Sequence, residues 1–135
     1  MRLRKIVLLA GMVGLLHIFT GTALGQEPPK TFPAREFWQE FEKDRQKAEK
    51  DFIGQYFNFT GVVVDTGMSI YMTPNVMLSE APEGPVYLIC VLPRTDVGTL
   101  SEYKNGDRVT MTGRVHHSKS GGGVVIKECK RATPQ

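Results

Sequence analysis

A stretch with strict two-residue alternation, residues 104–115 (KNGDRVTMTGRV), places the strongest constraint on the fold of this chain. Its odd-numbered residues from 109 to 115 are Val, Met, Gly and Val, and polar residues separate them, as in a strand with one buried and one solvated face. A fainter copy, residues 56–64 (YFNFTGVVV), also runs to Thr-Gly-x-Val. Because glycine inside a strand usually marks a bulge or a bend, the two copies predict a small sheet that curls into a barrel.

The first 25 residues have the three parts of a secretory signal peptide. A basic start precedes an apolar run from Ile6 to Phe19, and Ala23-Leu24-Gly25 ends the segment. We expect cleavage after Gly25; the alternative is an uncleaved membrane anchor. No cysteine follows the small residues, so no lipoprotein anchor is predicted. Either way, the rest of the chain is predicted to be periplasmic or secreted.

Removal of residues 1–25 changes the charge balance. All fourteen Asp and Glu residues and fourteen of the seventeen Lys and Arg residues follow position 25, so the mature chain has no formal net charge. Electrostatic attraction to a phosphate backbone is therefore expected to be weak unless the charges are segregated on one face.

The two cysteines, Cys90 and Cys129, both belong to the mature chain. In an oxidising compartment, two cysteines predict one disulfide. Two free buried thiols and a redox pair are the alternatives, and the absence of a Cys-x-x-Cys motif argues against the redox pair.

Composition divides the remaining chain into four segments. Residues 26–33 hold three prolines and are predicted to be a linker. Residues 34–53 are predicted to form one amphipathic helix, because their apolar side chains recur at helical spacing. Residues 54–130 are predicted to form the barrel, and residues 131–135 a tail. The predicted strands are 55–65, 68–79 with an interruption at Pro74, 86–92, 104–117 and 124–130, with a turn at 65–67 and the third strand covered on both sides.

Five strands with a hairpin between the last two fit a mainly β fold, a five-stranded Greek-key barrel of the OB type. In such a barrel the first strand neighbours the fourth and the third neighbours the fifth. The two Thr-Gly bends are then expected side by side, with Cys90 and Cys129 on adjacent strands. Cys129 does not share the parity of Val124 and Ile126, so a bridge requires a bulge near Glu128 or a bond on the outer side.

The run 52–63 (FIGQYFNFTGVV), the apolar strand ending near Cys90, the Gly-Asp-x-Val-x-x-x-Gly-x-Val of 100–115 and the closing Cys129 resemble the secreted tRNA-anticodon-binding-like OB family of bacteria. A weaker resemblance is to the small periplasmic bacterial OB-fold stress proteins. The first resemblance covers residues 37–130 and implies a leading helix, an OB barrel and a nucleic-acid role inferred from fold. The lipid-attachment cysteine of many members is absent here.

OB barrels bind ligands on the face of the second and third strands, between the loops that join strands one to two and four to five. The candidate ligand-binding residues at those places are Tyr71, Tyr87, Arg94, Arg114, His116 and Lys119. The sequence shows no catalytic constellation and no cofactor or metal motif. His116 and His117 are adjacent and are expected on opposite faces of a strand. We therefore expect a non-enzymatic binding domain for a protein, peptide or envelope polymer, with single-stranded nucleic acid or another anionic ligand as the alternative.

Overall fold

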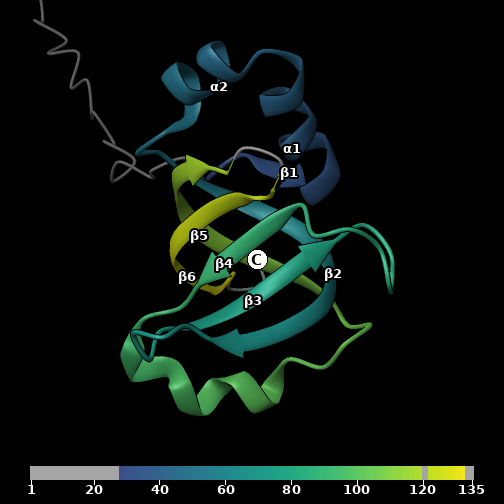
Figure 1. The fold of residues 1–135 in the computed structure, drawn as a ribbon, viewed down its shortest axis with the longest axis vertical. Coiled ribbons are helices and arrows are strands. Elements are labelled where there is room, and N and C mark those ends of the chain that lie inside the picture. The colour runs from purple at the N-terminus through teal and green to yellow at the C-terminus, as the bar shows by residue number, and fades with distance from the viewer. Residues whose placement is uncertain (1–27, 120–121, 133–135) are drawn as a thin grey trace, which may run out of the picture.

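The computed structural model describes residues 28–119 and 122–132 (Figure 1). The predicted signal peptide, residues 1–25, lies outside them. The elements are β1 (Thr31–Pro33), α1 (Ala34–Lys43), α2 (Arg45–Phe52), β2 (Tyr56–Met68), β3 (Pro74–Ser79), β4 (Leu88–Val91), the 3₁₀ helix η1 (Arg94–Glu102), β5 (Arg108–Ser118) and β6 (Val124–Arg131). None of the helices in the described ranges is long and apolar enough to cross a membrane.

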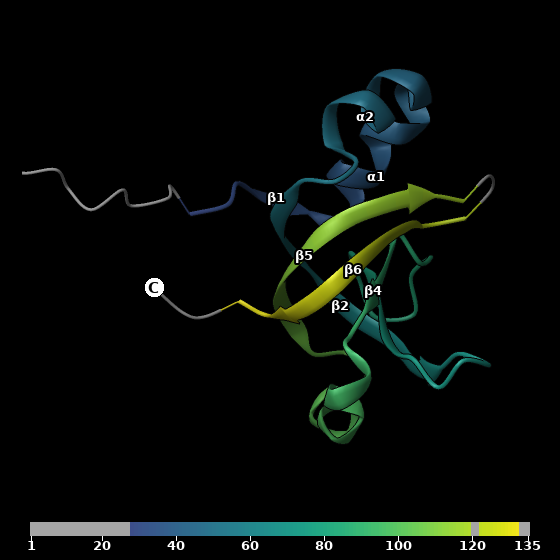
Figure 2. The same ribbon diagram turned by 90° about the vertical axis from the view of Figure 1, so that its left-hand side faces the viewer.

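Strands β2 to β6 close into a five-stranded barrel. Strand β2 pairs antiparallel with both β3 and β5, and β4 pairs antiparallel with β3 and parallel with β6. The antiparallel pairing of β5 with β6 completes the ring, as Figure 2 shows from the side of the β5–β6 hairpin. The predicted neighbours, first with fourth and third with fifth, are confirmed, and with them the OB-type barrel.

Two helices cap one end of the barrel, and η1 lies at the other end (Figure 1). The prediction of one helix over 34–53 is wrong, because Asp44 leaves the helical conformation with φ −155° and ψ 93°. Its side chain accepts a hydrogen bond of 3.1 Å from the backbone N–H of Lys47 and so caps α2. The apolar stripe of the prediction is nevertheless confirmed, with Phe37, Phe41 and Ala48 buried.

The end of the predicted linker is part of the sheet. Thr31–Pro33 pairs in parallel with Asn58–Thr60 of β2, so the linker prediction is wrong for these three residues. These residues join the sheet because the ring of Phe32 packs against those of Phe37 and Phe57, with ring centroids 5.2 Å and 5.4 Å apart. This aromatic anchor ties the chain to the barrel just before α1 begins.

The two Thr-Gly pairs lie on neighbouring strands, but they are not side by side. Gly61 faces Val109 across the ladder, whereas Gly113 faces Phe57, four positions away. Gly61 permits close packing rather than a bend: a Cβ there would lie 2.9 Å from the Ser79 carbonyl oxygen and 3.3 Å from Cβ of Ala34. Its small size lets the first residue of α1 contact the barrel.

The β2–β3 hairpin is longer than predicted. Residues 65–67 continue β2 to Met68 instead of forming a turn, and 69–73 form the loop before β3 begins at Pro74. The register shift between Val63 and Asp65 lets the long strand curve from one side of the barrel to the next.

The prediction that residues 86–92 are covered on both sides is also wrong, because Ile89 and Val91 are only half-buried.

The bulge that Cys129 requires is present. Glu128 has a left-handed φ of 55°, and the β5–β6 register shifts between Thr112 and Arg114. The extra residue turns Cys129 inward, where it is fully buried, as is Cys90 on the adjacent strand β4. Both thiols are free in the structure. Burial raises the pKa of Cys129, and the neighbouring Cys90 raises it further. The disulfide stays a prediction.

Candidate ligand groove

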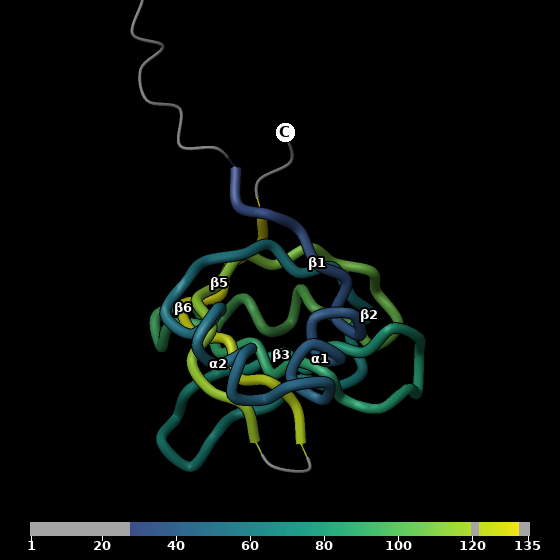
Figure 3. The backbone as a smooth tube through the Cα atoms, turned by 90° about the horizontal axis from the view of Figure 1, so that it is seen from above, coloured from purple at the N-terminus to yellow at the C-terminus, as the bar shows by residue number. Residues whose placement is uncertain are grey.

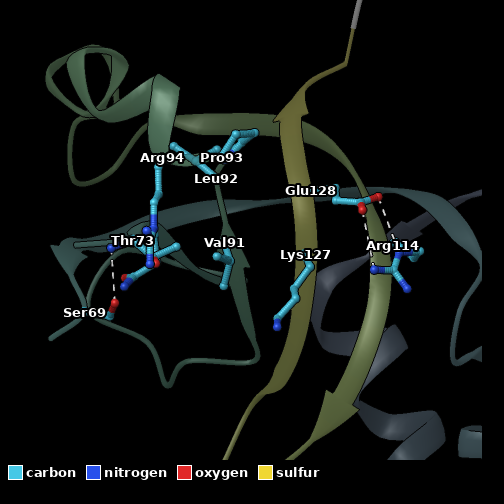
Figure 4. Close-up of a pocket in the computed structure, with 10 residues that line it drawn as sticks. Ser69, Thr73, Val91, Leu92, Pro93, Arg94, Arg114, Lys127 and Glu128 are labelled. Carbon is cyan, nitrogen blue, oxygen red and sulfur yellow. Dashed lines mark hydrogen bonds and ion pairs between the residues drawn. The ribbon is translucent and has the colours of Figure 1, made fainter. Parts of the chain in front are cut away.

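A groove of about 410 Å³ lies on the outer face of the barrel, where β3, β4, β6 and β5 run side by side (Figure 4). The loop before β3 and the start of η1 border it. Its lining residues are Ser69, Thr73, Asn75, Val91, Leu92, Pro93, Arg94, Arg114, Lys127 and Glu128. The groove crosses four consecutive strands and is therefore suited to an extended ligand rather than a compact one.

Strand register brings these side chains into one row. Asn75 pairs with Val91 and Lys127 pairs with Arg114, while Tyr56 of β2 pairs with Arg114 from the other side. Outward residues in register on adjacent strands project from the same face, so the row runs continuously across the barrel wall. The half-buried Val91 and the exposed Pro93 form an apolar section of this row.

One cation of the groove is already neutralised. The Arg114 guanidinium lies 3.4 Å from a Glu128 carboxylate oxygen, and the Tyr56 hydroxyl donates a hydrogen bond to the same carboxylate. The hydrogen bonds from Tyr56 and Arg114, in that order, lower the pKa of Glu128. The bond to Glu128 correspondingly raises the pKa of Tyr56. Glu128 is therefore ionised at neutral pH and holds Arg114 in place.

Two other cations of the groove have no ion-pair partner among the described residues. Arg94 and Lys127 form no ion pair with any residue in the described part of the chain. Figure 4 shows Arg94 reaching along the groove toward Thr73, while Lys127 projects from β6 between Val91 and Arg114. A groove with free cations at two points favours a ligand that carries more than one negative charge.

His116 lies beyond Arg114 on β5. Burial, followed by the positive charge of Lys127, lowers the pKa of His116, so its imidazole is neutral at pH 7. The expectation that His116 and His117 point to opposite faces is wrong: a register shift at this position brings their ring centroids to 4.8 Å. Within residues 28–119 and 122–132, no group of three or more His, Cys, Asp and Glu residues could hold a metal ion.

The predicted site residues do not converge on one place. Arg94 and Arg114 line the groove. Tyr71 lies outside it, on the β2–β3 loop, and is 70% exposed. Tyr87 packs against Trp38 with ring centroids 5.1 Å apart, which commits it to the contact between α1 and the barrel. Lys119 lines a separate hollow between the helices and the β5–β6 loop.

The family model of tRNA_anti-like matches residues 1–130, nearly the whole chain. The chain belongs to the tRNA_anti-like family. This result confirms the resemblance to the tRNA-anticodon-binding-like OB proteins and agrees with the closed barrel. A search of curated protein sequences finds no match.

Solved structures are similar to this tRNA_anti-like protein. A lipoprotein from Klebsiella pneumoniae that is proposed to bind nucleic acid has a TM-score of 0.64 at 20% identity, covering 78% of this chain and 92% of its own. OBody AM3L15, solved bound to hen egg-white lysozyme, has a TM-score of 0.46 at 19% identity, covering 63% and 82% of the two chains. At 20% identity the likeness to the lipoprotein shows the fold alone.

The sequence analysis missed the two other charged residues of the groove, Lys127 and Glu128, and also Tyr56 at its border. Lys127 has the opposite parity to the inward Ile126, so alternation alone identifies it as an outward cation. Glu128 is different, because its position depends on a bulge that alternation does not reveal. Tyr56 borders the site only because barrel closure pairs it with Arg114.

Charges are segregated along this tRNA_anti-like chain. Residues 51–93, which include β2, β3 and β4, contain no Lys or Arg, whereas the β5–β6 hairpin, residues 108–131, contains six of them against the single acidic residue Glu128. Formal neutrality therefore conceals a basic ribbon, and this ribbon contributes Lys127 and Arg114 to the groove.

Proposed function

We propose that this protein is a non-catalytic OB-fold binding domain of the bacterial cell envelope whose groove holds a short segment of single-stranded nucleic acid. The charge segregation of the β5–β6 ribbon carries this proposal. The neutrality of the mature chain argues against sequence-independent attraction only if the charges are mixed. The six cations of this hairpin restore that attraction locally, and two of them, Arg114 and Lys127, line the groove.

The contacts follow from the groove itself. Arg94 and Lys127 are free to bind phosphate oxygens, whereas the Glu128 carboxylate already balances the charge of Arg114. Val91 and Pro93 offer an apolar surface to base faces. Such contacts are made to backbone and base surface, so we expect binding with little sequence preference.

Fluorescence anisotropy with a labelled twelve-nucleotide mixed-sequence DNA tests the proposal on the chain from Gln26 to Gln135. With phosphates at Arg94 and Lys127, the logarithm of the association constant is expected to fall with log salt with a slope of about −1.4, about 0.7 per contact. The double variant Arg94→Gln/Lys127→Gln is expected to weaken binding about tenfold and to reduce the slope toward zero.

The matched control is Lys43→Gln/Lys50→Gln, which removes two exposed cations from the helical hairpin. It loses the same net charge and is expected to leave binding unchanged. Equal weakening of DNA binding in both double variants would show that the loss comes from net charge alone. If the anisotropy of the DNA did not change when the parent protein is added at 50 mM salt, the proposal would be overturned.

A polypeptide or neutral envelope polymer in the same groove is the second candidate. One observation favours it: none of the ten lining residues is aromatic, so bases would lack the stacking platform that single-strand binders use. If the affinity for the labelled DNA did not change between 50 and 300 mM salt, phosphate contacts would be excluded and this second candidate would be selected. The basic, apolar and small-residue parts of the leader and the lipoprotein relative support the envelope location in both cases.

A further inference from the structure

The end of β2 and the loop that follows it expose a compact set of apolar side chains, here called the tip: Met68, Ile70, Tyr71 and Met72. Ile70 is 89% exposed, Tyr71 70% and Met72 67%. Figure 3, which views the molecule from above, shows the end of the β2–β3 hairpin projecting beyond the barrel wall. Side chains of this kind at a protruding end contribute nothing to the core and indicate an interaction site.

The backbone of the tip is built to hold this conformation. Ser69 exchanges backbone hydrogen bonds with the loop, accepting from Met72 at 2.9 Å and donating to Thr73 at 3.0 Å. Its hydroxyl oxygen accepts two more, from the N–H groups of Tyr71 and Thr73, each at 3.2 Å. Met72 adopts a left-handed φ of 61°, which is unfavourable for a residue with a side chain. The loop therefore presents its apolar side chains instead of folding them back.

The surrounding charges identify the occupant. The fourteen residues from Thr66 to Ser79 carry no charge. The nearest acid on the hairpin, Asp65, lies three residue pairs behind the Met68–Pro74 pair, or about 10 Å at 3.4 Å per residue. Arg94 lines the groove beside Ser69 and Thr73, at the base of the tip.

The apolar tip, the uncharged residues behind it and the cation at its base match the successive layers of an anionic bilayer. Interfacial insertion buries apolar side chains to a depth of about 5–10 Å, and basic residues beside them bind lipid phosphates. The tyrosine fits the same layer, because its ring is apolar and its hydroxyl is polar. We propose that the tip inserts into the headgroup region of an anionic lipid bilayer, with Arg94 against the lipid phosphates.

This membrane contact goes beyond nucleic-acid binding and uses different side chains for its apolar part. The groove needs none of Ile70, Tyr71 and Met72, so the two activities are separable by mutation. The tip is convex and the groove is concave, which suits a soft bilayer and an extended polymer, respectively.

Vesicle binding tests the proposal on the chain from Gln26 to Gln135. Co-sedimentation is measured with phosphatidylcholine vesicles that contain one quarter phosphatidylglycerol and with pure phosphatidylcholine vesicles. We expect binding to the mixed vesicles, and the variant Ile70→Ser/Met72→Ser to lower the bound fraction about tenfold. The control Val97→Ser removes another exposed apolar side chain, on η1, and is expected to bind as the parent does.

The variant Tyr71→Trp reports insertion directly. Its fluorescence emission is expected to shift to the blue with mixed vesicles and to be quenched by lipids brominated on their acyl chains, relative to the parent protein, whose one tryptophan is Trp38. Absence of a shift, or equal loss of binding in the tip and Val97 variants, would overturn the proposal. Absence of vesicle binding would assign the tip to a protein partner instead. Unchanged oligonucleotide binding by the tip variant separates this outcome from a failure of the groove.

Discussion

The protein places apolar side chains in two opposite settings. All six phenylalanines that follow residue 25 form one cluster between the helices and β2, with Phe37 at its centre: Phe32, Phe37, Phe41, Phe52, Phe57 and Phe59. The tip exposes Ile70, Tyr71 and Met72 to solvent. The first set excludes water and so stabilises the fold, whereas the second leaves the free energy of burial available to a partner.

The largest expected effect comes from the centre of the cluster. Phe37 is fully buried and touches five other phenylalanine rings, so Phe37→Ala is expected to lower the free energy of unfolding by about 3–5 kcal/mol. Ile70→Ala is expected to change it by no more than about 0.5 kcal/mol. Urea unfolding followed by circular dichroism compares the two variants. Equal losses would abolish the distinction between cluster and tip.

The disulfide is the second test of the barrel interior. If Cys90 and Cys129 are bridged in the mature protein, reduction is expected to lower stability by up to about 4 kcal/mol on the chain-entropy model. The thiol content of the denatured protein, measured before and after reduction, decides whether the bridge exists. Two titratable thiols before reduction would leave the pair as buried free cysteines, as the structure has them.

Gly113 tests the packing around the bulge. A Cβ at this position would lie 2.8 Å from Sγ of Cys129 and 3.1 Å from the carbonyl oxygen of Lys127, so Gly113→Ala is expected to cost about 1–3 kcal/mol. Gly98→Ala is the control, because its Cβ would meet nothing within 4 Å. Thermal unfolding of both variants measures the difference. A loss as large for Gly98→Ala would mean that close packing at the bulge is not the cause.

The smallest expected effect is the pH response of the groove. The folded protein lowers the pKa of Glu128, so the ion pair contributes stability above the unfolded value of about 4.3 and loses it as the pH falls through the folded pKa. Melting temperatures of the parent and of Glu128→Gln, measured from pH 6 to pH 3, are expected to converge at the acid end. Parallel curves would exclude Glu128 from the acid response.

Much of the fold could be predicted from local pattern. Alternation identified β5 with its inward side chains, and helical spacing identified the face of α1 that packs on the barrel. Strand count and hairpin position then led to the OB topology. The break at Asp44 was not predictable from the apolar stripe, because the stripe continues through α2 while the backbone does not.

The candidate site was less predictable. Arg94 and Arg114 were identified because they lie where OB barrels bind ligands. Tyr87 has the same character in the sequence, yet it packs on Trp38, and only the docking of α1 decides this.

The sequence by itself determined the strand and helix patterns, the barrel class and the absence of Lys and Arg from residues 51–93. Those properties depend on residue spacing and composition, which are local. The tertiary structure decided which cations remain free, because pairing depends on barrel closure and on the one-residue bulge at Glu128. It also decided that the apolar residues 70–72 stay exposed while the phenylalanines do not, since burial depends on which segments meet in space.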